Sequence, residues 1–463
     1  MASKSQELLL LSATSSDPFT TLIVNPLTGG SYWSYKGAEL QNGVSGLVEP
    51  LGRRGDFLLI AIHEKPLLHV VSVHGKNKFH VKTVLSGPIR CLVSHPEGTY
   101  IFAAIGLQIF TWMAFSGELL SVVDAHYQNI STMKISCDGS FLVTGSEDGH
   151  VHVYSIIDLV CEPEHKTVKV EPIFKWNAHS LAVTDLHITA GNNPRVISVS
   201  LDHTAVFYSF TQKQLFHRIS SDRPLHACAM DPSETRLFLG TDQGQVAMVN
   251  LYTQCQPREQ MITTNGGSLS ELKVLENHKA PISKLAVNAE GSLLVSSDIE
   301  GNYAIIDIRS LQCLKLNSIR SKVHTLRFIE NWPSLSEANY KAPKFVPSVL
   351  QKQKGTSLLV SIPLIASERT EKDDSSNAVE TVVDQLISRL RNNDDKQQPT
   401  VSIKKSKLKK RKRKTSKNTD DSADISMSSS STENLESLKK EIIKLKQVNQ
   451  SLYDYAANII LKS

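Results

Sequence analysis

Residues 140–156, SFLVTGSEDGHVHVYSI, decide the fold of this chain. An apolar run (FLV) comes first, a stretch rich in turn residues follows, and alternating apolar positions then resume. Such a pattern predicts two strands joined by a turn. Asp148-Gly149 favours a tight turn, because glycine adopts the positive φ that a hairpin requires. The stretch therefore predicts a β-hairpin, which cannot bury both of its faces alone.

The hairpin is repeated along the chain. Further copies align on the turn at residues 198–210, 240–251 and 297–308. The residues in the turn column of this alignment are Asp148, Asp202, Gln243 and Glu300. A histidine precedes three of the units, and these residues are His126, His179 and His278. Units of roughly 40 to 57 residues with this start are typical of WD-repeat propeller blades.

Two weaker units precede the clear ones, at residues 7–37 and 55–84, and residues 88–123 follow the blade template closely, which gives seven blades. The opening leucine run reads as the first strand. Two later strands, in residues 321–332 and 355–365, are expected to close the ring by joining the first blade, because an open propeller leaves exposed edges. Residues 333–353 between them read as a surface loop. The prediction is an all-β, seven-bladed WD-repeat β-propeller over residues 1–365.

The composition describes a globular chain with free thiols. Hydrophobic residues make up 40% of the sequence, and the six cysteines are scattered without a C-x-x-C pair. This favours reduced thiols in an intracellular protein over a disulfide framework or a zinc site. The opening leucine run is too short for a signal peptide, and there is no apolar stretch long enough to span a membrane.

The charge is unevenly distributed. Residues 366–463 contain 20 Lys and Arg against 15 Asp and Glu, whereas residues 1–365 contain 31 of each. A neutral propeller does not suggest a groove for nucleic acid. The excess positive charge lies in the tail, which is where contact with nucleic acid is possible.

The first part of the tail, residues 366–433, is predicted to be a mostly disordered linker. Within it, residues 378–391 follow helical apolar spacing after a sequence that resembles a capping box at Asn377 and Glu380. This short amphipathic helix has two open interpretations, docking on the propeller or docking on a partner.

The segment 404–414, KKSKLKKRKRK, has nine basic residues in eleven. So dense a block repels itself and does not fold alone. Nuclear import is favoured over a merely solvated tail, and contact with nucleic-acid phosphates is a further interpretation. The basic residues are Lys404, Lys405, Lys407, Lys409, Lys410, Arg411, Lys412, Arg413 and Lys414.

Residues 434–463 carry four heptads and predict a coiled-coil helix. The residues of its apolar seam are Leu435, Leu438, Ile442, Leu445, Asn449, Leu452, Ala456 and Ile459. A single Asn in the seam fixes register, commonly in a two-stranded pairing. Self-association as a homodimer is favoured over packing on the helices of a partner subunit.

Motifs for catalysis, nucleotide binding or metal binding are absent from the sequence. His126, His179 and His278 admit two interpretations, as ligands or bases, or as structural residues that hydrogen-bond to a strand hydroxyl and a turn carboxylate. The structural interpretation is favoured. It assigns the turn carboxylates Asp148, Asp202 and Glu300 to the same network, with no enzyme activity, cofactor or metal.

Residues 115–156, FSGELLSVVDAHYQNISTMKISCDGSFLVTGSEDGHVHVYSI, together with HSLAVTDLH at 179–187, SVSLDHT at 198–204 and the C-terminal heptads, resemble the WD repeat-containing protein 18 family. That family supplies the WD-repeat subunit of the rixosome, a complex for maturation of the large ribosomal subunit. Two departures from a strong WD template stand out: Trp112 alone keeps a tryptophan near the expected strand position, and Gln243 replaces an acidic turn residue.

The resemblance implies a non-enzymatic scaffold in the nucleus, in nucleolus and nucleoplasm. It implies partners, namely an α-solenoid scaffold subunit, a HEAT-like subunit and, indirectly, pre-60S particles and the AAA ATPase midasin. It also implies a role in processing of the second internal transcribed spacer of pre-rRNA and in 60S maturation, with dimerisation through the C-terminal helix.

A second hypothesis comes from the basic tail. A chromatin-associated WD-repeat scaffold in replication licensing or transcription regulation would use residues 404–414 to contact DNA.

Overall fold

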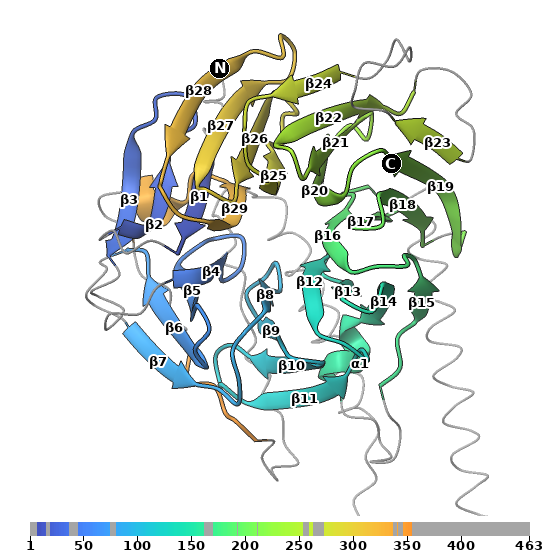
Figure 1. The fold of residues 1–463 in the computed structure, drawn as a ribbon. Helices are drawn as coiled ribbons and strands as arrows, with labels where there is room; N and C mark the ends of the chain where they lie inside the picture. The colour runs from blue at the N-terminus through green and yellow to red at the C-terminus, as the bar shows by residue number, and fades with distance from the viewer. Residues whose placement is uncertain are drawn as a thin grey trace, which may run out of the picture. The chain divides into compact units, whose positions relative to one another are not determined.

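Seven β-sheets form a ring, which confirms the all-β, seven-bladed propeller (Figure 1). The computed structural model describes residues 7–353, with gaps at 15–18, 37–44, 75–79, 162–169, 192, 211, 253–258, 263–272, 337–339 and 341–345. Six of the described sheets have four strands and one has five. The predicted domain division, with its linker and C-terminal helix, extends into residues outside those described.

Each blade runs from an inner strand near the ring centre to an outer strand at the rim (Figure 1). Blade 1 comprises, in that order, β29 (Val323–Ile329), β1 (Leu8–Ala13), β2 (Phe19–Val24) and β3 (Ser31–Lys36). Blade 2 comprises β4 (Ser45–Pro50), β5 (Phe57–Ile62), β6 (Leu67–Ser72) and β7 (His80–Val84). Blade 3 comprises β8 (Cys91–Ser94), β9 (Tyr100–Ile105), β10 (Gln108–Met113) and β11 (Leu119–Asp124).

The remaining blades repeat this order. Blade 4 comprises β12 (Ile130–Ile135), β13 (Phe141–Ser146), β14 (His150–Ser155) and β15 (Phe174–Asn177), and α1 (Ile156–Val160) follows β14. Blade 5 comprises β16 (Val183–Ile188), β17 (Arg195–Ser200), β18 (Thr204–Ser209), β19 (Gln214–Ser221) and β23 (Glu259–Ile262). Blade 6 comprises β20 (Leu225–Met230), β21 (Arg236–Thr241), β22 (Gln245–Asn250) and β24 (Lys273–Glu276). Blade 7 comprises β25 (Ile282–Val287), β26 (Leu293–Asp298), β27 (Asn302–Asp307) and β28 (Cys313–Ser318).

The two ends of the ring meet in blade 1. β1 pairs antiparallel with β2 on one side and with β29 on the other, in a register that sets Leu9 opposite Phe328 and Leu11 opposite Leu326. The predictions that the leucine run is a strand and that residues 321–332 supply a closing strand are confirmed. The second expected closing strand, residues 355–365, lies outside the described residues.

The hydrophobic core lies between neighbouring blades. Val143 of blade 4, for example, shares one buried cluster with Val196 and Tyr208 of blade 5. A strand in the middle of a blade is covered on both faces by the adjacent blades, so it is apolar at successive positions. This is why all six residues of β1 are buried and why its sequence shows a run of leucines instead of alternation.

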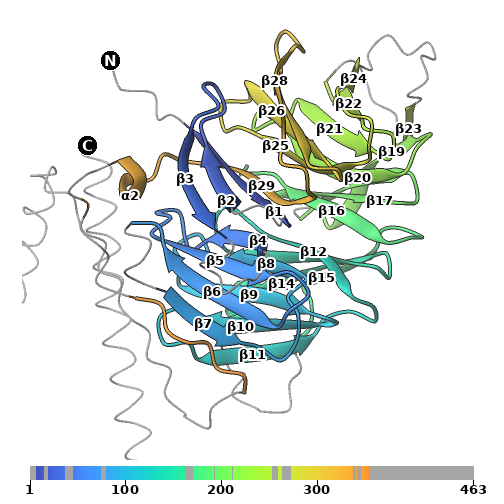
Figure 2. The ribbon, with the colours of Figure 1, turned by 60° about the vertical axis from the view of Figure 1, so that its left-hand side comes forward.

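After β29 the chain runs back along the ring and packs against blades 2 and 3. We call this part the strap; it consists of Trp332, α2 (Pro333–Ser336) and residues 346–353, which Figure 2 shows on one side of the ring. Leu350 is buried, and the Trp112 indole donates a 2.8 Å hydrogen bond to the carbonyl of Gln351. Gly55 is required beneath the strap, because a Cβ there would lie 2.0 Å from the Trp332 ring.

The strap corrects the prediction that residues 333–353 form only a surface loop. The described part of this segment contains a short helix and a buried leucine, because blades 2 and 3 offer apolar surface and free backbone groups beside it. The Ser348 amide donates to the carbonyl of Ala114, and the Gln351 amide donates to that of Gly117.

We expect truncation to separate ring closure from the strap. A chain that ends at Arg320 lacks β29 and leaves an edge of β1 unpaired, so it should aggregate without a cooperative thermal transition. A chain that ends at Ile329 keeps the ring but loses the strap, and it should be destabilised by about 2–5 kcal/mol, as for the loss of a buried leucine. A chain that ends at Gln353 is the control. Differential scanning calorimetry would contradict this account if the chain ending at Arg320 unfolded like the control.

Candidate functional site

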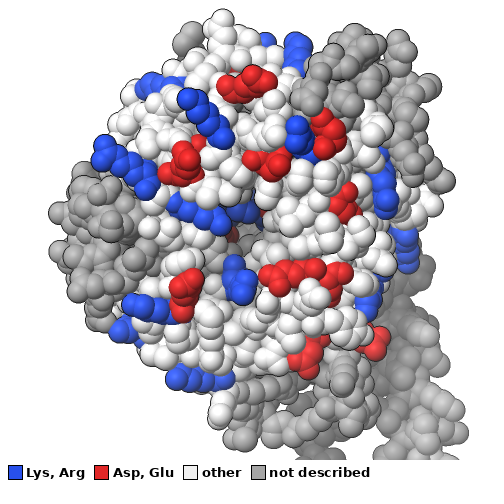
Figure 3. Space-filling model, viewed as in Figure 1, with Lys and Arg blue, Asp and Glu red and all other residues white. Residues whose placement is uncertain are grey.

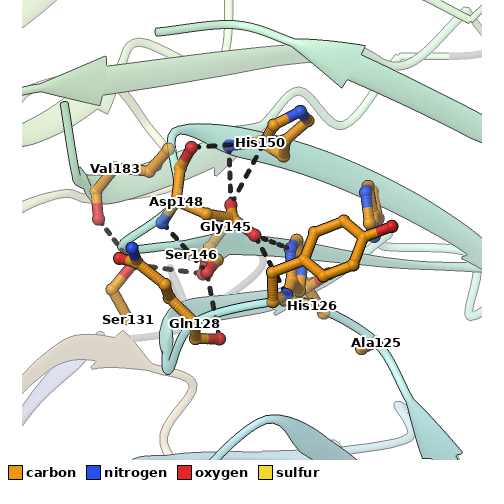
Figure 4. Close-up of polar contacts among 12 residues, drawn as sticks. Ala125, His126, Gln128, Ser131, Gly145, Ser146, Asp148, His150 and Val183 are labelled. Atoms are coloured by element: carbon orange, nitrogen blue, oxygen red, sulfur yellow. Dashed lines mark hydrogen bonds and ion pairs between the residues drawn. The ribbon is translucent and has the colours of Figure 1, made fainter. Parts of the chain in front are cut away.

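In blade 4, His126 joins the loop after β11 to the β13–β14 hairpin (Figure 4). Its Nε2 hydrogen-bonds with the Thr144 hydroxyl at 2.8 Å, and its Nδ1 lies 3.4 Å from an Asp148 carboxylate oxygen. Asp148 also accepts the backbone amides of His150 at 2.9 Å and Tyr127 at 3.2 Å. The turn carboxylate thus binds both the hairpin and the loop that enters the blade.

Blade 5 repeats the arrangement with shorter distances. His179 Nε2 lies 2.8 Å from the Ser198 hydroxyl, and Nδ1 lies 3.1 Å from both oxygens of Asp202. Asp202 accepts the Thr204 amide and the Ser180 amide, each at 3.0 Å. Burial raises the pKa of Asp202, but hydrogen bonds from His179 and Thr204 outweigh it and hold that pKa below its usual range. The structure therefore brings His179 and Asp202 together.

In blade 7 the structure assigns a different carboxylate from the predicted one. His278 Nδ1 lies 3.2 Å from Asp298, and its Nε2 lies 2.8 Å from the Ser296 hydroxyl. Glu300, which the alignment placed in the network, is exposed in the following turn. Asp298 accepts the Asn302 amide at 2.8 Å, which is the role that Asp148 and Asp202 have in their blades.

Position along the hairpin explains this correction. Asp298 ends β26 and is fully buried against the imidazole, whereas Glu300 stands two residues further, beside Gly301. Alignment on the turn glycine places Glu300 in the carboxylate column. A buried acid at the end of an apolar run is the signal that identifies Asp298 instead, because a buried carboxylate needs such a partner.

Two imidazoles of the network, those of His126 and His278, have a pKa below the usual range of histidine. Burial lowers the pKa of His126 to about 4, although Asp148 raises it in part, and burial also lowers the pKa of His278. The His126 ring stacks on that of His152 with centroids 4.0 Å apart, and burial lowers the pKa of His152 to about 3. The neutral His126 ring joins the entering loop to β13 through its hydrogen bond with Thr144.

An ion pair links the inner strands of non-adjacent blades. Lys284 Nζ of β25 lies 3.3 Å from Asp185 of β16, and the Cys228 amide of β20 donates to the second Asp185 oxygen at 3.4 Å. The charge of Asp185 raises the pKa of Lys284. Figure 3 shows Lys and Arg side chains near the centre of the ring. Asp185 of blade 5 thus contacts both Lys284 of blade 7 and the Cys228 amide of blade 6. These contacts connect three blades, which is a structural role.

The two buried thiols, those of Cys91 and Cys228, are poor nucleophiles. Burial raises the pKa of Cys91 to about 12 and that of Cys228 well above its usual value, so both are protonated at neutral pH. All five described cysteines are free, and no group of three His, Cys, Asp or Glu in the described part of the chain is placed to hold a metal ion. Among the described residues no helix is long and apolar enough to cross a membrane.

The other predicted site residues lie outside the described part of the chain. These are the basic residues of segment 404–414 and the heptad residues of segment 434–463, so their assigned roles stay predictions. Trp112 is buried in β10, and its indole donates a hydrogen bond to the Gln351 carbonyl of the strap. Both contacts agree with a packing role.

The closed ring and its His–Asp–Ser/Thr networks define a WD-repeat β-propeller, and a family model for the WD domain, G-beta repeat, matches residues 117–155. The chain is 44% identical over 384 residues to pre-rRNA-processing protein pro-1 of Caenorhabditis elegans, covering 82% of this chain and 72% of that protein. It is 28% identical over 311 residues to WD repeat-containing protein 18 of Homo sapiens, covering 67% and 70% of the two chains. It is also 29% identical over 251 residues, 54% of each chain, to protein ROOT INITIATION DEFECTIVE 3 of Arabidopsis thaliana.

The chain belongs to the WD repeat-containing protein 18 family, as the resemblance carried by residues 115–156 and the later copies predicted.

We expect Asp298, and not Glu300, to stabilise blade 7. Asp298→Asn removes a charged acceptor that is buried against His278, and it should lower the free energy of unfolding by about 1.5–3 kcal/mol. Glu300→Gln is the matched control and should change it by less than about 0.5 kcal/mol. Urea denaturation of both variants measures the difference, and a larger loss for Glu300→Gln would contradict the assignment.

The His126–His152 stack should make the protein sensitive to acid. Free histidine titrates near pH 6.5, so between about pH 6.5 and pH 4 the unfolded chain binds protons that the folded chain excludes. Stability should therefore fall as the pH decreases through this window. His152→Phe keeps a stacked ring without the titration, and it should reduce the slope by up to about 1.4 kcal/mol per pH unit. Denaturation between pH 7 and pH 4 would refute this if the slope did not change.

Proposed function

We propose that this chain is a non-enzymatic scaffold in rRNA processing, a subunit of a nuclear complex that processes the second internal transcribed spacer of pre-rRNA and matures the 60S subunit. The observation that carries the proposal is the 44% identity, across 82% of this chain, to a protein named for pre-rRNA processing. The resemblance to the rixosome subunit found in the sequence supports the finer statement about the complex.

The described residues support a scaffold over an enzyme. His179 and His278 each contact a hydroxyl through Nε2 and a carboxylate through Nδ1, and burial keeps the Cys91 and Cys228 thiols protonated. In the described ring these histidines and carboxylates hold strands and loops together, and the buried thiols lie in the core. The outer surfaces are left for contact with other proteins.

The proposed partners are those of the complex: an α-solenoid scaffold subunit, a HEAT-like subunit and, indirectly, pre-60S particles and midasin. The C-terminal heptads provide a homodimer contact in this proposal, and segment 404–414 provides import to the nucleus. The alternative, a chromatin-associated scaffold, assigns segment 404–414 to DNA contact.

Depletion of the protein tests the proposal. We expect precursors that retain the second internal transcribed spacer to accumulate on hybridisation blots, and free 60S subunits to decline in gradients. Unchanged precursors and 60S levels would contradict the proposal.

Replacing segment 404–414 with an unrelated import signal separates the two functions. Rescue of processing is expected if the segment is a nuclear address. Failure to rescue, together with loss of DNA binding, would favour the chromatin alternative.

A further inference from the structure

The outer strand of blade 3 has an open edge beside the point where the described chain ends. β11 pairs with β10 on one side, and no strand within the described residues pairs with its other side. The Ala125 amide donates to the Leu107 carbonyl, which sets the alternation of the antiparallel ladder. The backbone groups of Val123 therefore face β10, whereas those of Val122 and Asp124 face outward. The Val122 side chain is also exposed, and such an edge is a template for a further strand.

The strap runs in the same direction as the chain that enters β11. The Ser348 amide donates to the carbonyl of Ala114, and the Gln351 amide donates at 2.7 Å to that of Gly117. Between these two bonds the strap and blade 3 advance by the same number of residues, so the two segments are parallel. β11 begins two residues after Gly117, and the described chain ends two residues after Gln351. In Figures 1 and 2 the orange end of the strap lies close to β11.

Blade 5 shows that an outer strand of this ring accepts a parallel fifth strand. β23 pairs in parallel with β19, in a register that runs from Arg218 opposite Glu259 to Ser221 opposite Ile262. A segment of four residues is therefore enough to extend a blade.

The sequence that follows the strap has the pattern of such a strand. Residues 355–362, GTSLLVSI, are rich in apolar and β-branched residues, and Pro363, which cannot donate to a ladder, ends the run. If the equal advance of the strap and blade 3 continues, Gly355 comes opposite Ser121, so the segment reaches β11 without a connecting loop. In blade 1, by contrast, β29 already holds the innermost place, and the strap ends two blades away from it.

We propose that residues 355–362 add in parallel to β11 as a fifth strand of blade 3. The segment bonds to the outward backbone groups of Val122 and Asp124, and its apolar side chains cover Val122. It closes an edge that would otherwise be a template for pairing with other chains. This interaction goes beyond the proposed function, because it does not depend on the process that the protein serves.

Residue-resolved hydrogen exchange of the full-length protein tests the proposal. The amides of Val122 and Asp124 should be protected to a degree comparable with that of Val123, which is bonded to β10. The full-length double variant L358P/L359P removes two successive amides, one of which faces β11 in either register. It should accelerate exchange at Val122 and Asp124 by about tenfold or more.

The double variant A366P/S367P, which lies beyond the segment, is the matched control and should leave the exchange of Val122 and Asp124 unchanged. Unchanged protection of Val123 shows that blade 3 remains folded in each variant. The unsubstituted protein gives an independent measurement, because fast exchange of Val122 and Asp124 in it would overturn the proposal whether or not the proline variant folds.

Three further results would overturn the proposal. The first is equal exchange in L358P/L359P and its control. The second is faster exchange at β3 alone, which would place the segment on blade 1. The third is protection of Val122 that disappears on dilution, which would assign the edge to a second copy of the chain. None of these outcomes bears on pre-rRNA processing, so failure here is distinguishable from failure of the proposed function.

Discussion

The pairing of β1 with β29 is the constraint on which the rest of the structure depends. It joins strands separated by more than three hundred residues, and it is the contact that closes the first blade. The hydrophobic core of a propeller lies between neighbouring blades, so an open ring would expose one face of its terminal blades. Leu9 and Leu11 illustrate the dependence, since both belong to the cluster between blades 7 and 1.

In blades 4, 5 and 7, polar networks fix the junction between the entering loop and the hairpin turn, which apolar packing alone does not specify. Packing between blades fixes which face of a strand is buried, but it does not fix how the entering loop meets the hairpin turn. The bonds from Asp148 and Asp202 to backbone amides fix that junction in blades 4 and 5. Blade 7 obtains the same junction from Asp298, two residues earlier, which shows that the position of the carboxylate in space matters more than its column in an alignment.

The repeated hairpin made most of the fold predictable. A strand–turn–strand pattern that recurs with a preceding histidine has few solutions, and the blade count, the first strand and the closing strand at 321–332 all follow from it. The strap could not be predicted, because Leu350 is buried only by surface that blades 2 and 3 create after they fold. β4 was missed since its sequence, SGLVEP, shows no clear alternation. β23 was missed because a parallel partner far along the chain leaves no local signal.

The candidate site was predictable in kind and only partly in detail. His126, His179 and His278 were identified by their positions, and the structure brings each to a carboxylate and a hydroxyl. The prediction of Glu300 was wrong. The acid that contacts His278 is the one that is buried within hydrogen-bond distance of the imidazole, and its spacing from the turn glycine does not determine it.

The central claim is that one closed ring, sealed at β1 and β29, organises the outer surfaces of this protein. Native-state hydrogen exchange on the full-length chain tests it most directly, since amides bonded inside a core sheet exchange at free energies that approach that of global unfolding. The account predicts that the amides bonded between β1 and β29 are as strongly protected as those of β13 and β26. Rapid exchange of β1 or β29 while the other blades remain protected would contradict it.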